Sequence, residues 1–153
     1  GVDMGMYYRR LDYSKMVKGR HPIAAYEFLG PKLEGKDVIL IDDMISSGKS
    51  ILEIASLLKK RGAGKIFICT TFGLFTEGME KFDEAYQNGI FDKLLTTNLV
   101  YQTPELLSKP YYITCDMSKY IALIIDTLNH DASISSLLNP LDRINKFLKE
   151  HNS

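Results

Sequence analysis

Residues 37–50 read DVILIDDMISSGKS, and this stretch decides the fold class. Its apolar run at 38–41 is largely β-branched, which is typical of a strand buried on both faces of a parallel sheet. Two acids, Asp42 and Asp43, end the run, a turn of small residues follows, and an apolar helical stripe begins after Ser50. The stretch therefore predicts a strand, a tight turn and a helix in immediate succession.

The same unit recurs along the chain. Further strand patterns lie at residues 65–70, 93–97 and 111–114, and helical patterns lie at 51–62, 77–88, 118–129 and from Pro140 onward. Strands that alternate with helices predict an α/β fold, a parallel sheet flanked by helices with right-handed crossovers. Residues 1–36 lack this periodicity and are rich in Gly and Pro, so they predict an extended flap or hairpin.

The composition restricts the classes of function. The chain has 153 residues, of which 45% are hydrophobic and 25% charged, as in an ordinary globular domain. Its 19 basic residues balance 19 acidic ones, which argues against a nucleic-acid coat or a polybasic membrane anchor. No apolar run approaches the roughly 20 residues that cross a bilayer. Because Cys69 and Cys115 lie inside apolar runs, we expect reduced core cysteines, and hence a cytoplasmic protein without nucleic-acid or membrane partners.

The turn after the first strand is suited to bind phosphate. In parallel sheets, ligands bind beyond the carboxyl ends of the strands. Residues 46–50 offer backbone N–H groups, three hydroxyls and a helix N-terminus, and Gly48 lets the backbone approach a ligand closely. Asp42 and Asp43 could accept hydrogen bonds from sugar hydroxyls or hold a divalent metal. A phosphate at one end and a diol at the other outline a ribose 5-phosphate.

Simpler roles for these residues account for only part of the stretch. Taken singly, the two acids could cap the turn and Ser50 could be an ordinary helix N-cap, but neither role explains the whole combination. The triplet at 48–50, Gly-Lys-Ser, is similar to the end of a nucleoside-triphosphate P-loop. That motif requires Gly at position 43, where this chain has Asp43, so the spacing argues against a P-loop.

Residues 38–50 closely resemble the phosphoribosyl-diphosphate-binding motif of type I phosphoribosyltransferases and of ribose-phosphate pyrophosphokinases. Four further segments are similar to the second family: residues 34–37, 70–75, 95–98 and 131–138. The resemblance implies a type I phosphoribosyltransferase-like fold, with residues 37–153 as the ribose-5-phosphate-binding domain and residues 1–36 as a mobile catalytic flap and lead-in. Because family members are longer, the chain is similar to their carboxyl-terminal domain, without the amino-terminal half.

The resemblance implies a ribose-phosphate diphosphokinase. This enzyme transfers diphosphate from ATP to ribose 5-phosphate, giving phosphoribosyl diphosphate and AMP for nucleotide biosynthesis. In this chain, Asp42 and Asp43 would hold the ribose hydroxyls, directly or through Mg²⁺. The residues implied to hold the 5-phosphate are Ser46, Ser47, Gly48, Lys49 and Ser50. The resemblance also implies a homo-oligomer, and an isolated chain that is inactive without the ATP-binding half.

The flap carries the implied catalytic cations. Residues 8–11, Tyr-Arg-Arg-Leu, resemble the Lys-Arg-Arg loop of the family. Arg9 and Arg10 would neutralise charge on the diphosphoryl group in the transition state, unless they form only a solvated patch. Leu11 replaces a second Arg, which keeps open a non-catalytic regulatory homologue of the synthetase. A phosphoribosyltransferase is the other alternative, although residues 1–36 show no clear base-selecting hood.

Overall fold

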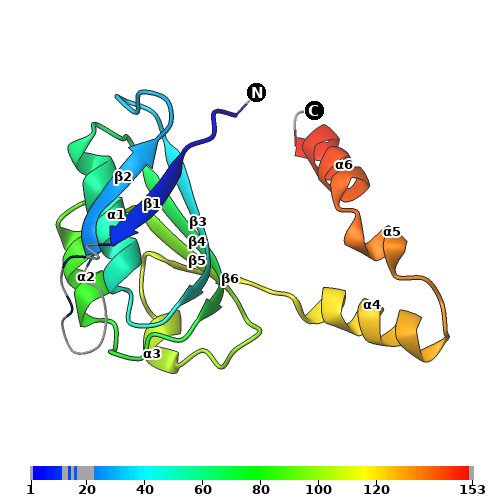
Figure 1. Cartoon of the computed structure of the whole chain (residues 1–153). Helices are drawn as coiled ribbons and strands as arrows, with labels where there is room; N and C mark the ends of the chain where they lie inside the picture. Colours follow the sequence, from blue (N-terminus) through cyan, green and yellow to red (C-terminus); the bar gives the residue numbers. More distant parts are fainter. Residues whose placement is uncertain (1, 12–13, 15, 17–22, 152–153) are drawn as a thin grey trace. The chain divides into compact units, whose positions relative to one another are not determined.

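The structure of the chain, a computed structural model, describes residues 2–11, 14, 16 and 23–151 (Figure 1). It contains two compact units, residues 1–114 and 115–153, and each is described by itself. The elements up to the boundary are β1 (Met6–Leu11), β2 (Ile23–Leu29), β3 (Val38–Ile45), α1 (Lys49–Lys60), β4 (Ile66–Gly73), α2 (Glu80–Gln87), β5 (Lys93–Thr97), α3 (Pro104–Leu107) and β6 (Tyr112–Cys115). The second unit contains α4 (Ser118–Asn129), α5 (Ser135–Leu138) and α6 (Leu141–His151).

The first unit is built on a four-stranded sheet in the order β3-β4-β5-β6. β3 and β4 pair in parallel, from Val38 opposite Ile66 to Ile45 opposite Gly73. β4 and β5 also pair in parallel, so the carboxyl ends of these three strands share one edge of the sheet. The predicted parallel α/β architecture is confirmed.

Helices α1 and α2 cover one face of this sheet (Figure 1). Two successive crossovers of the same hand, running in the same direction along the sheet, place both helices on that face. The core between helices and strands includes Ile51, Ala55, Leu58, Ile66, Ile68, Phe82, Phe91, Leu94 and Tyr111, all less than 5% exposed. Burying a large apolar side chain contributes roughly 1.5–3 kcal/mol, so this layer is the main source of stability.

The other face of β3 is open within this unit. Ile39 and Ile41 are 64% and 78% exposed, because alternate side chains of a strand point away from the helix-covered face. The prediction that this strand is buried on both faces is therefore wrong for the described unit. Cys69, opposite Ile41 in register, is half-buried, as is Cys115, and neither forms a disulfide within the described structure. The prediction of core positions for the two cysteines is wrong for the same reason.

Two predicted boundaries near the site also need correction. β3 continues to Ile45, so Asp42 and Asp43 lie inside the strand rather than after it. α1 begins at Lys49, and its N-cap is Gly48, so Ser50 lies within the helix. Strand β5 and helix α4 lie as predicted. The short helices α3 and α5 were not predicted, because four residues are too few to show a helical period.

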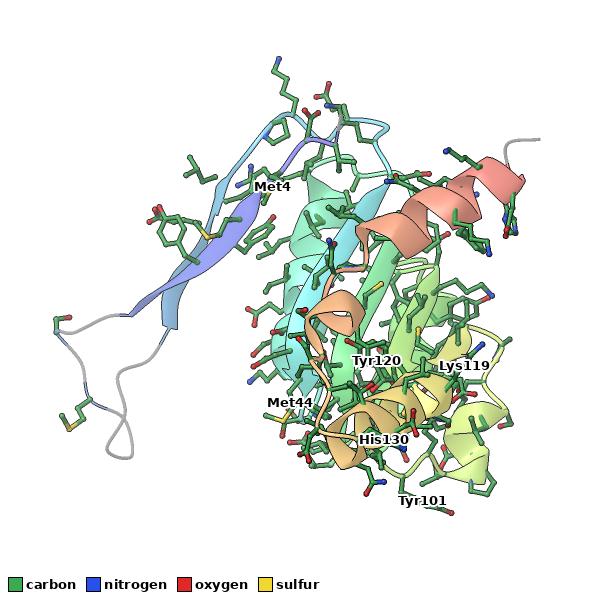
Figure 2. All side chains as sticks on the ribbon, turned by 90° about the vertical axis from the view of Figure 1, so that its right-hand side faces the viewer. Met4, Met44, Tyr101, Lys119, Tyr120 and His130 are labelled. Carbon is green, nitrogen blue, oxygen red and sulfur yellow. The ribbon has the colours of Figure 1, made fainter. Side chains whose placement is uncertain are left out.

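The amino-terminal segment forms an antiparallel hairpin of β1 and β2, which confirms the hairpin form of the predicted flap. Its inner face packs on the core through Tyr7 and Phe28, whose ring centroids are 4.9 Å apart. The Arg61 guanidinium lies 5.2 Å from the centre of the Phe28 ring. On the outer face Met6 and Leu29 are 60% and 67% exposed, and Met4, which precedes β1, is also exposed (Figure 2).

The second unit consists of helices and has little buried surface. No residue of α4 is fully buried, and its Ile125 and Leu128 are 62% and 57% exposed. The Tyr120 hydroxyl donates to the Leu137 carbonyl at 3.0 Å, which joins α4 to α5. Across the described part of the chain, no helix combines the length and apolar character that spanning a membrane requires.

Candidate functional site

The backbone between β3 and α1 forms the centre of the candidate site, and we call residues 46–50 the cradle. Gly48 has φ +81°, a left-handed conformation that turns the chain directly from the strand into the helix. The first α-helical bond runs from Leu52 N to Gly48 O at 3.0 Å. The N-cap residue Gly48 has no side chain to cap this helix end, and Lys49 N makes one long bond, 3.5 Å, to the Ser47 hydroxyl. The first N–H groups of α1 therefore point away from the helix at its positive end, an arrangement that attracts anions.

The side chains of the cradle are accessible to a ligand. Ser46, Lys49 and Ser50 are exposed, and Ser47 is half-buried with its hydroxyl 3.5 Å from Lys49 N. Lys49 adds a cation to the helix end. Its charge reaches Glu77, whose pKa is lowered chiefly by its bond to Lys81 and further by Lys49. The structure thus brings the five predicted phosphate-binding residues together at one strand–helix junction.

The structure does not bring the two predicted acids together in the same way. Asp42 and Asp43 are consecutive residues of β3, and both are exposed. Successive side chains of a strand leave on opposite faces, so the two carboxylates diverge. Asp42 Oδ1 accepts a hydrogen bond from the Asp43 backbone N–H at 2.9 Å. Asp42 lies opposite Thr70, whose buried Oγ1 has no hydrogen-bond partner within the described structure.

These acids offer a divalent cation only part of a coordination shell. No group of three or more His, Cys, Asp or Glu side chains that could hold a metal occurs among the residues described. Mg²⁺ is commonly held by one or two carboxylates, with substrate phosphates and water completing its six oxygens. The exposed carboxylate of either Asp42 or Asp43 therefore fits a Mg²⁺ that a phosphorylated substrate also binds.

Beneath the cradle lies an aromatic side chain that sequence reasoning did not assign to the site. A Cβ at Gly48 would lie under 3.0 Å from Cζ and Cε2 of Phe82. Phe82 is fully buried, and the Phe75 ring meets it edge-on, with centroids 5.3 Å apart. The helical pattern places Phe82 on the apolar side of α2. Its contact with Gly48 joins residues distant in sequence, and local periodicity carries no signal for such a contact.

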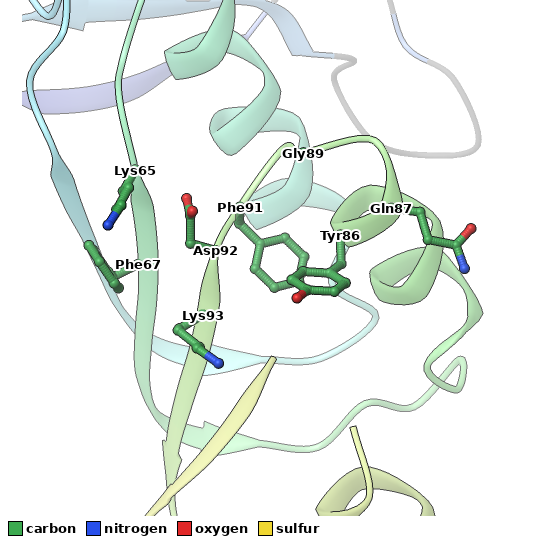
Figure 3. A pocket seen from close by; sticks show the side chains of 8 residues that line it. All are labelled: Lys65, Phe67, Tyr86, Gln87, Gly89, Phe91, Asp92 and Lys93. Atoms are coloured by element: carbon green, nitrogen blue, oxygen red, sulfur yellow. The ribbon is translucent and has the colours of Figure 1, made fainter. Parts of the chain in front are cut away.

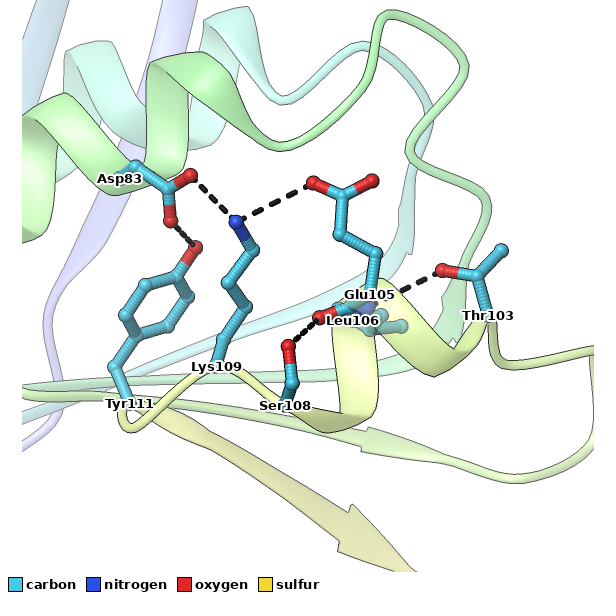
Figure 4. Close-up of polar contacts among 7 residues, drawn as sticks. All are labelled: Asp83, Thr103, Glu105, Leu106, Ser108, Lys109 and Tyr111. Atoms are coloured by element: carbon cyan, nitrogen blue, oxygen red, sulfur yellow. Dashed lines mark hydrogen bonds and ion pairs between the residues drawn. The ribbon is translucent and has the colours of Figure 1, made fainter.

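A polar cluster fixes α2 from the side of β6 (Figure 4). Asp83 Oδ2 accepts from Lys109 Nζ at 2.6 Å, and Asp83 Oδ1 accepts from the Tyr111 hydroxyl at 2.7 Å. Lys109 Nζ is also 3.3 Å from Glu105. Burial works to raise the pKa of Asp83, but the bonds from Lys109 and Tyr111 outweigh it and lower that pKa. The bond to Asp83 raises the pKa of Lys109. The cluster holds the helix that carries Phe82.

The structure has a cavity of about 570 Å³ at the opposite edge of the sheet (Figure 3). It is lined by Lys65, Phe67, Tyr86, Gln87, Gly89, Phe91, Asp92 and Lys93. Asp92 accepts from Ile66 N at 2.8 Å, and Lys93 Nζ donates to Pro110 O at 2.9 Å. These polar groups are engaged within the protein, and the cavity lies at the amino-terminal ends of β4 and β5. It is separate from the cradle.

The predicted catalytic cations lie on the hairpin. Arg9 and Arg10 are residues of β1, opposite Tyr26 and Ala25 of β2. Their side chains, and that of Leu11, lie outside the described part of the structure, as do residues 17–22 of the predicted flap.

Comparison with known proteins gives the family. The family model described as the phosphoribosyl synthetase-associated domain matches residues 14–139. The chain belongs to this family. Among curated proteins, it is similar to the ribose-phosphate pyrophosphokinases of Vibrio parahaemolyticus (27% identity, 70% of this chain, 33% of that protein) and Shewanella oneidensis (30% identity, with the same coverage). The predicted ribose-phosphate pyrophosphokinase family is confirmed.

The fold of this phosphoribosyl synthetase domain is also found among solved structures. The crystal structure of the phosphoribosylpyrophosphate synthetase from Mycobacterium smegmatis matches with a TM-score of 0.62 and 21% identity, over 72% of this chain and 36% of that one. The type I phosphoribosyltransferase-like fold is thereby confirmed. The chain spans about a third of the length of the curated relatives that it matches.

Proposed function

We propose that this chain is the ribose-5-phosphate-binding part of a ribose-phosphate diphosphokinase. The observation that carries the proposal is the exposed N-terminus of α1, whose N-cap is the left-handed Gly48 at the carboxyl end of β3. Backbone N–H groups and hydroxyls of residues 46–50 bind the 5-phosphate, and Lys49 adds positive charge. Carboxylates of Asp42 and Asp43 accept hydrogen bonds from ribose hydroxyls beside it.

In the longer protein, this site presents the sugar to ATP. The anomeric oxygen forms a bond to the β-phosphorus, and the bond from that phosphorus to the oxygen it shares with the α-phosphorus breaks. AMP leaves, and the hydroxyl proton passes to solvent. Arg9 and Arg10 stabilise the negative charge on the transferring group. Asp42 or Asp43, together with the substrates, would hold a Mg²⁺, which would supply positive charge to the phosphates. Cytoplasmic location and homo-oligomeric assembly are part of this proposal.

One observation favours a second function. Leu11 stands where the resemblance implies a cation, and its loss would weaken stabilisation of the transition state. A regulatory homologue that binds ribose 5-phosphate but transfers no diphosphate would keep the cradle and lose this residue. Measurement of AMP formation by the longer protein, with ATP, Mg²⁺ and ribose 5-phosphate, separates the two. AMP formation supports the enzyme, and sugar-phosphate binding without AMP formation supports the regulator.

The binding half of the proposal is tested by calorimetric titration of ribose 5-phosphate into this chain with Mg²⁺. We expect saturable binding that the double variant Asp43→Asn, Ser47→Ala loses. A matched double variant in the second unit, Asp126→Asn with Ser135→Ala, should bind as the wild type does. Inorganic phosphate should compete, whereas ribose alone should not bind. A folded wild-type chain that does not bind ribose 5-phosphate would refute the half-site in this chain.

A further inference from the structure

Residues 74–76, which follow β4, are hydrogen-bonded to the end of β3 and to the first residue of the cradle. Leu74 N donates to Ile45 O at 2.8 Å, and Thr76 N donates to Ser46 O at 3.0 Å. These two bonds continue the pairing of β3 and β4 past its last pair, Ile45 and Gly73. The position of Ser46 therefore depends on residues 74–76, to which the sequence pattern assigns no role.

Phe75 lies at the centre of this segment in an unfavourable backbone conformation. Its φ is +46°, in the left-handed region that bulky residues rarely adopt and that costs on the order of 1 kcal/mol or more. A residue such as Gly or Asn would reach this conformation more easily. The contacts of the Phe75 ring must therefore contribute enough free energy to offset the unfavourable backbone conformation.

The Phe75 ring packs between the sheet and the helix α2. It meets Phe82 edge-on at 5.3 Å and Tyr112 edge-on at 6.5 Å, measured between centroids. Gly73 makes room for it, because a Cβ at that position would lie within 3.0 Å of two carbons of the Phe75 ring. Edge-to-face pairs contribute about 0.5–1.5 kcal/mol each, enough to offset the backbone cost.

Phe75 is thus connected to the cradle by two sets of contacts, one through its backbone neighbours and one through its ring. Its backbone neighbours bond to Ile45 and Ser46, and its ring supports the ring of Phe82, on which Gly48 lies. On the far side, the bonds of Asp83 to Lys109 and Tyr111 prevent α2 from shifting to compensate. Removal of the Phe75 ring therefore leaves a space beside Phe82 that α2 does not close, and the Phe82 ring is free to turn into it.

We propose that Phe75 is a positioning residue of the cradle: it fixes the backbone at Gly48, and so directs the N–H groups of α1 toward the phosphate. The proposal rests on the proposed function for the identity of the ligand, but not for the backbone effect. Phe75 does not itself touch the phosphate, and it acts through Phe82 and the Ser46 carbonyl. Misplacement of a binding group by a fraction of an ångström is enough to weaken a rigid anion site.

The test uses the 153-residue chain and the variant Phe75→Leu, with Phe75→Met as a second variant that fills the space more flexibly. The control is Phe28→Leu, which removes a half-buried ring that contacts Tyr7 of the hairpin. The readouts are the thermal midpoint, the affinity for ribose 5-phosphate, and the NMR resonance of the Gly48 α-protons. The ring current of Phe82 shifts this resonance, and observing the shift requires no ligand.

We expect both Phe75 variants to displace the Gly48 resonance and to weaken ribose 5-phosphate binding by about tenfold. In the control variant, the Gly48 resonance and the ribose 5-phosphate affinity should stay as in the wild type, even if its thermal midpoint falls as much as in the Phe75 variants. A Gly48 resonance that is unchanged in a folded Phe75 variant overturns the proposal, as does an unchanged affinity. If the wild type binds no ribose 5-phosphate, the proposed function fails, and the Gly48 resonance alone decides whether Phe75 positions the cradle.

Discussion

Gly48 lies against the ring of Phe82, so close that a Cβ at position 48 would lie under 3.0 Å from two ring carbons. Gly48 also has φ +81°. These are two independent reasons for glycine at this position, and each has its own energetic consequence. A substitution here therefore tests both the left-handed turn and the contact beneath it.

The first prediction is that Gly48→Ala lowers the free energy of unfolding by more than the backbone conformation explains. An Ala at positive φ costs roughly 1–2 kcal/mol, and overlap with Phe82 adds about 1–3 kcal/mol. The control is Gly35→Ala, which has φ +70° but no atom within 4 Å of its added Cβ in the described structure. Denaturant unfolding of both variants gives the comparison. Equal losses of unfolding free energy in the two variants would show that the Phe82 ring moves aside at no measurable energetic cost.

The second prediction concerns the ion pair of Asp83 and Lys109, whose side chains are 33% and 17% exposed. We expect Lys109→Met to lower the free energy of unfolding at pH 7 by about 2 kcal/mol, between the values of surface and buried pairs. The exposed pair of Glu77, which precedes α2, and Lys81 of that helix supplies the control, Lys81→Met, which should change stability little.

The pH dependence of this effect follows from the two pKa shifts. The pKa of Asp83 is lowered in the folded state, so its contribution is present above the unfolded value near about 4 and is lost as the pH falls through the folded value. The pKa of Lys109 is raised, so its contribution is present below about 10.4 and is lost as the pH rises through its folded value. Denaturant unfolding at pH 3, 7 and 9 should show a plateau above pH 4. A loss that is constant down to pH 3 would contradict the pairing.

The third prediction separates the two acids of β3. Because Asp42 and Asp43 diverge from one strand, we expect unequal effects of their single variants on ribose 5-phosphate affinity. Asp43→Asn should weaken binding about tenfold with Mg²⁺ present, the loss of one charge-assisted contact. Asp42→Asn should weaken binding less, since Asp42 Oδ1 is already bonded to the Asp43 N–H and an amide oxygen can keep that bond.

Calorimetric titration with and without Mg²⁺ tests this difference. Without Mg²⁺, the affinity of the wild type for ribose 5-phosphate should fall close to that of Asp43→Asn. Equal losses of affinity in the two single variants would show that the two carboxylates contribute equally to binding, against the divergence seen in β3.

The fourth prediction concerns the attachment of the hairpin. Phe28→Ala removes the ring that contacts Tyr7 and Arg61, so the hairpin should separate from the core. We expect a loss of about 1–3 kcal/mol, less than for a fully buried Phe, and faster protease cleavage within residues 2–30. Leu29→Ala, at an exposed neighbouring position, should leave the cleavage rate unchanged. Ribose 5-phosphate affinity should be the same in both variants, and a loss in Phe28→Ala would show that the hairpin supports the cradle.

Much of the fold could be predicted because its signals are local. The apolar runs of β3, β4 and β5 and the stripes of α1 and α4 lie within short windows, and their alternation implies a parallel sheet. Boundaries were less certain for a physical reason. Asp42 and Asp43 are polar, yet the backbone pairs with β4 up to Ile45, because strand pairing depends on backbone hydrogen bonds that polar side chains do not prevent.

The sequence by itself determined the chemistry of the site, since hydroxyls, a glycine, a cation and two acids follow one strand in order along the chain. Tertiary structure alone decided how that site is supported. Phe75 and Phe82 reach the cradle from other elements, and the bonds of Asp83 hold α2 to the segment between α3 and β6. Such contacts join residues far apart in sequence, and they arise only when crossovers stack helices on the sheet. Local patterns record which groups are present, whereas packing determines where they point.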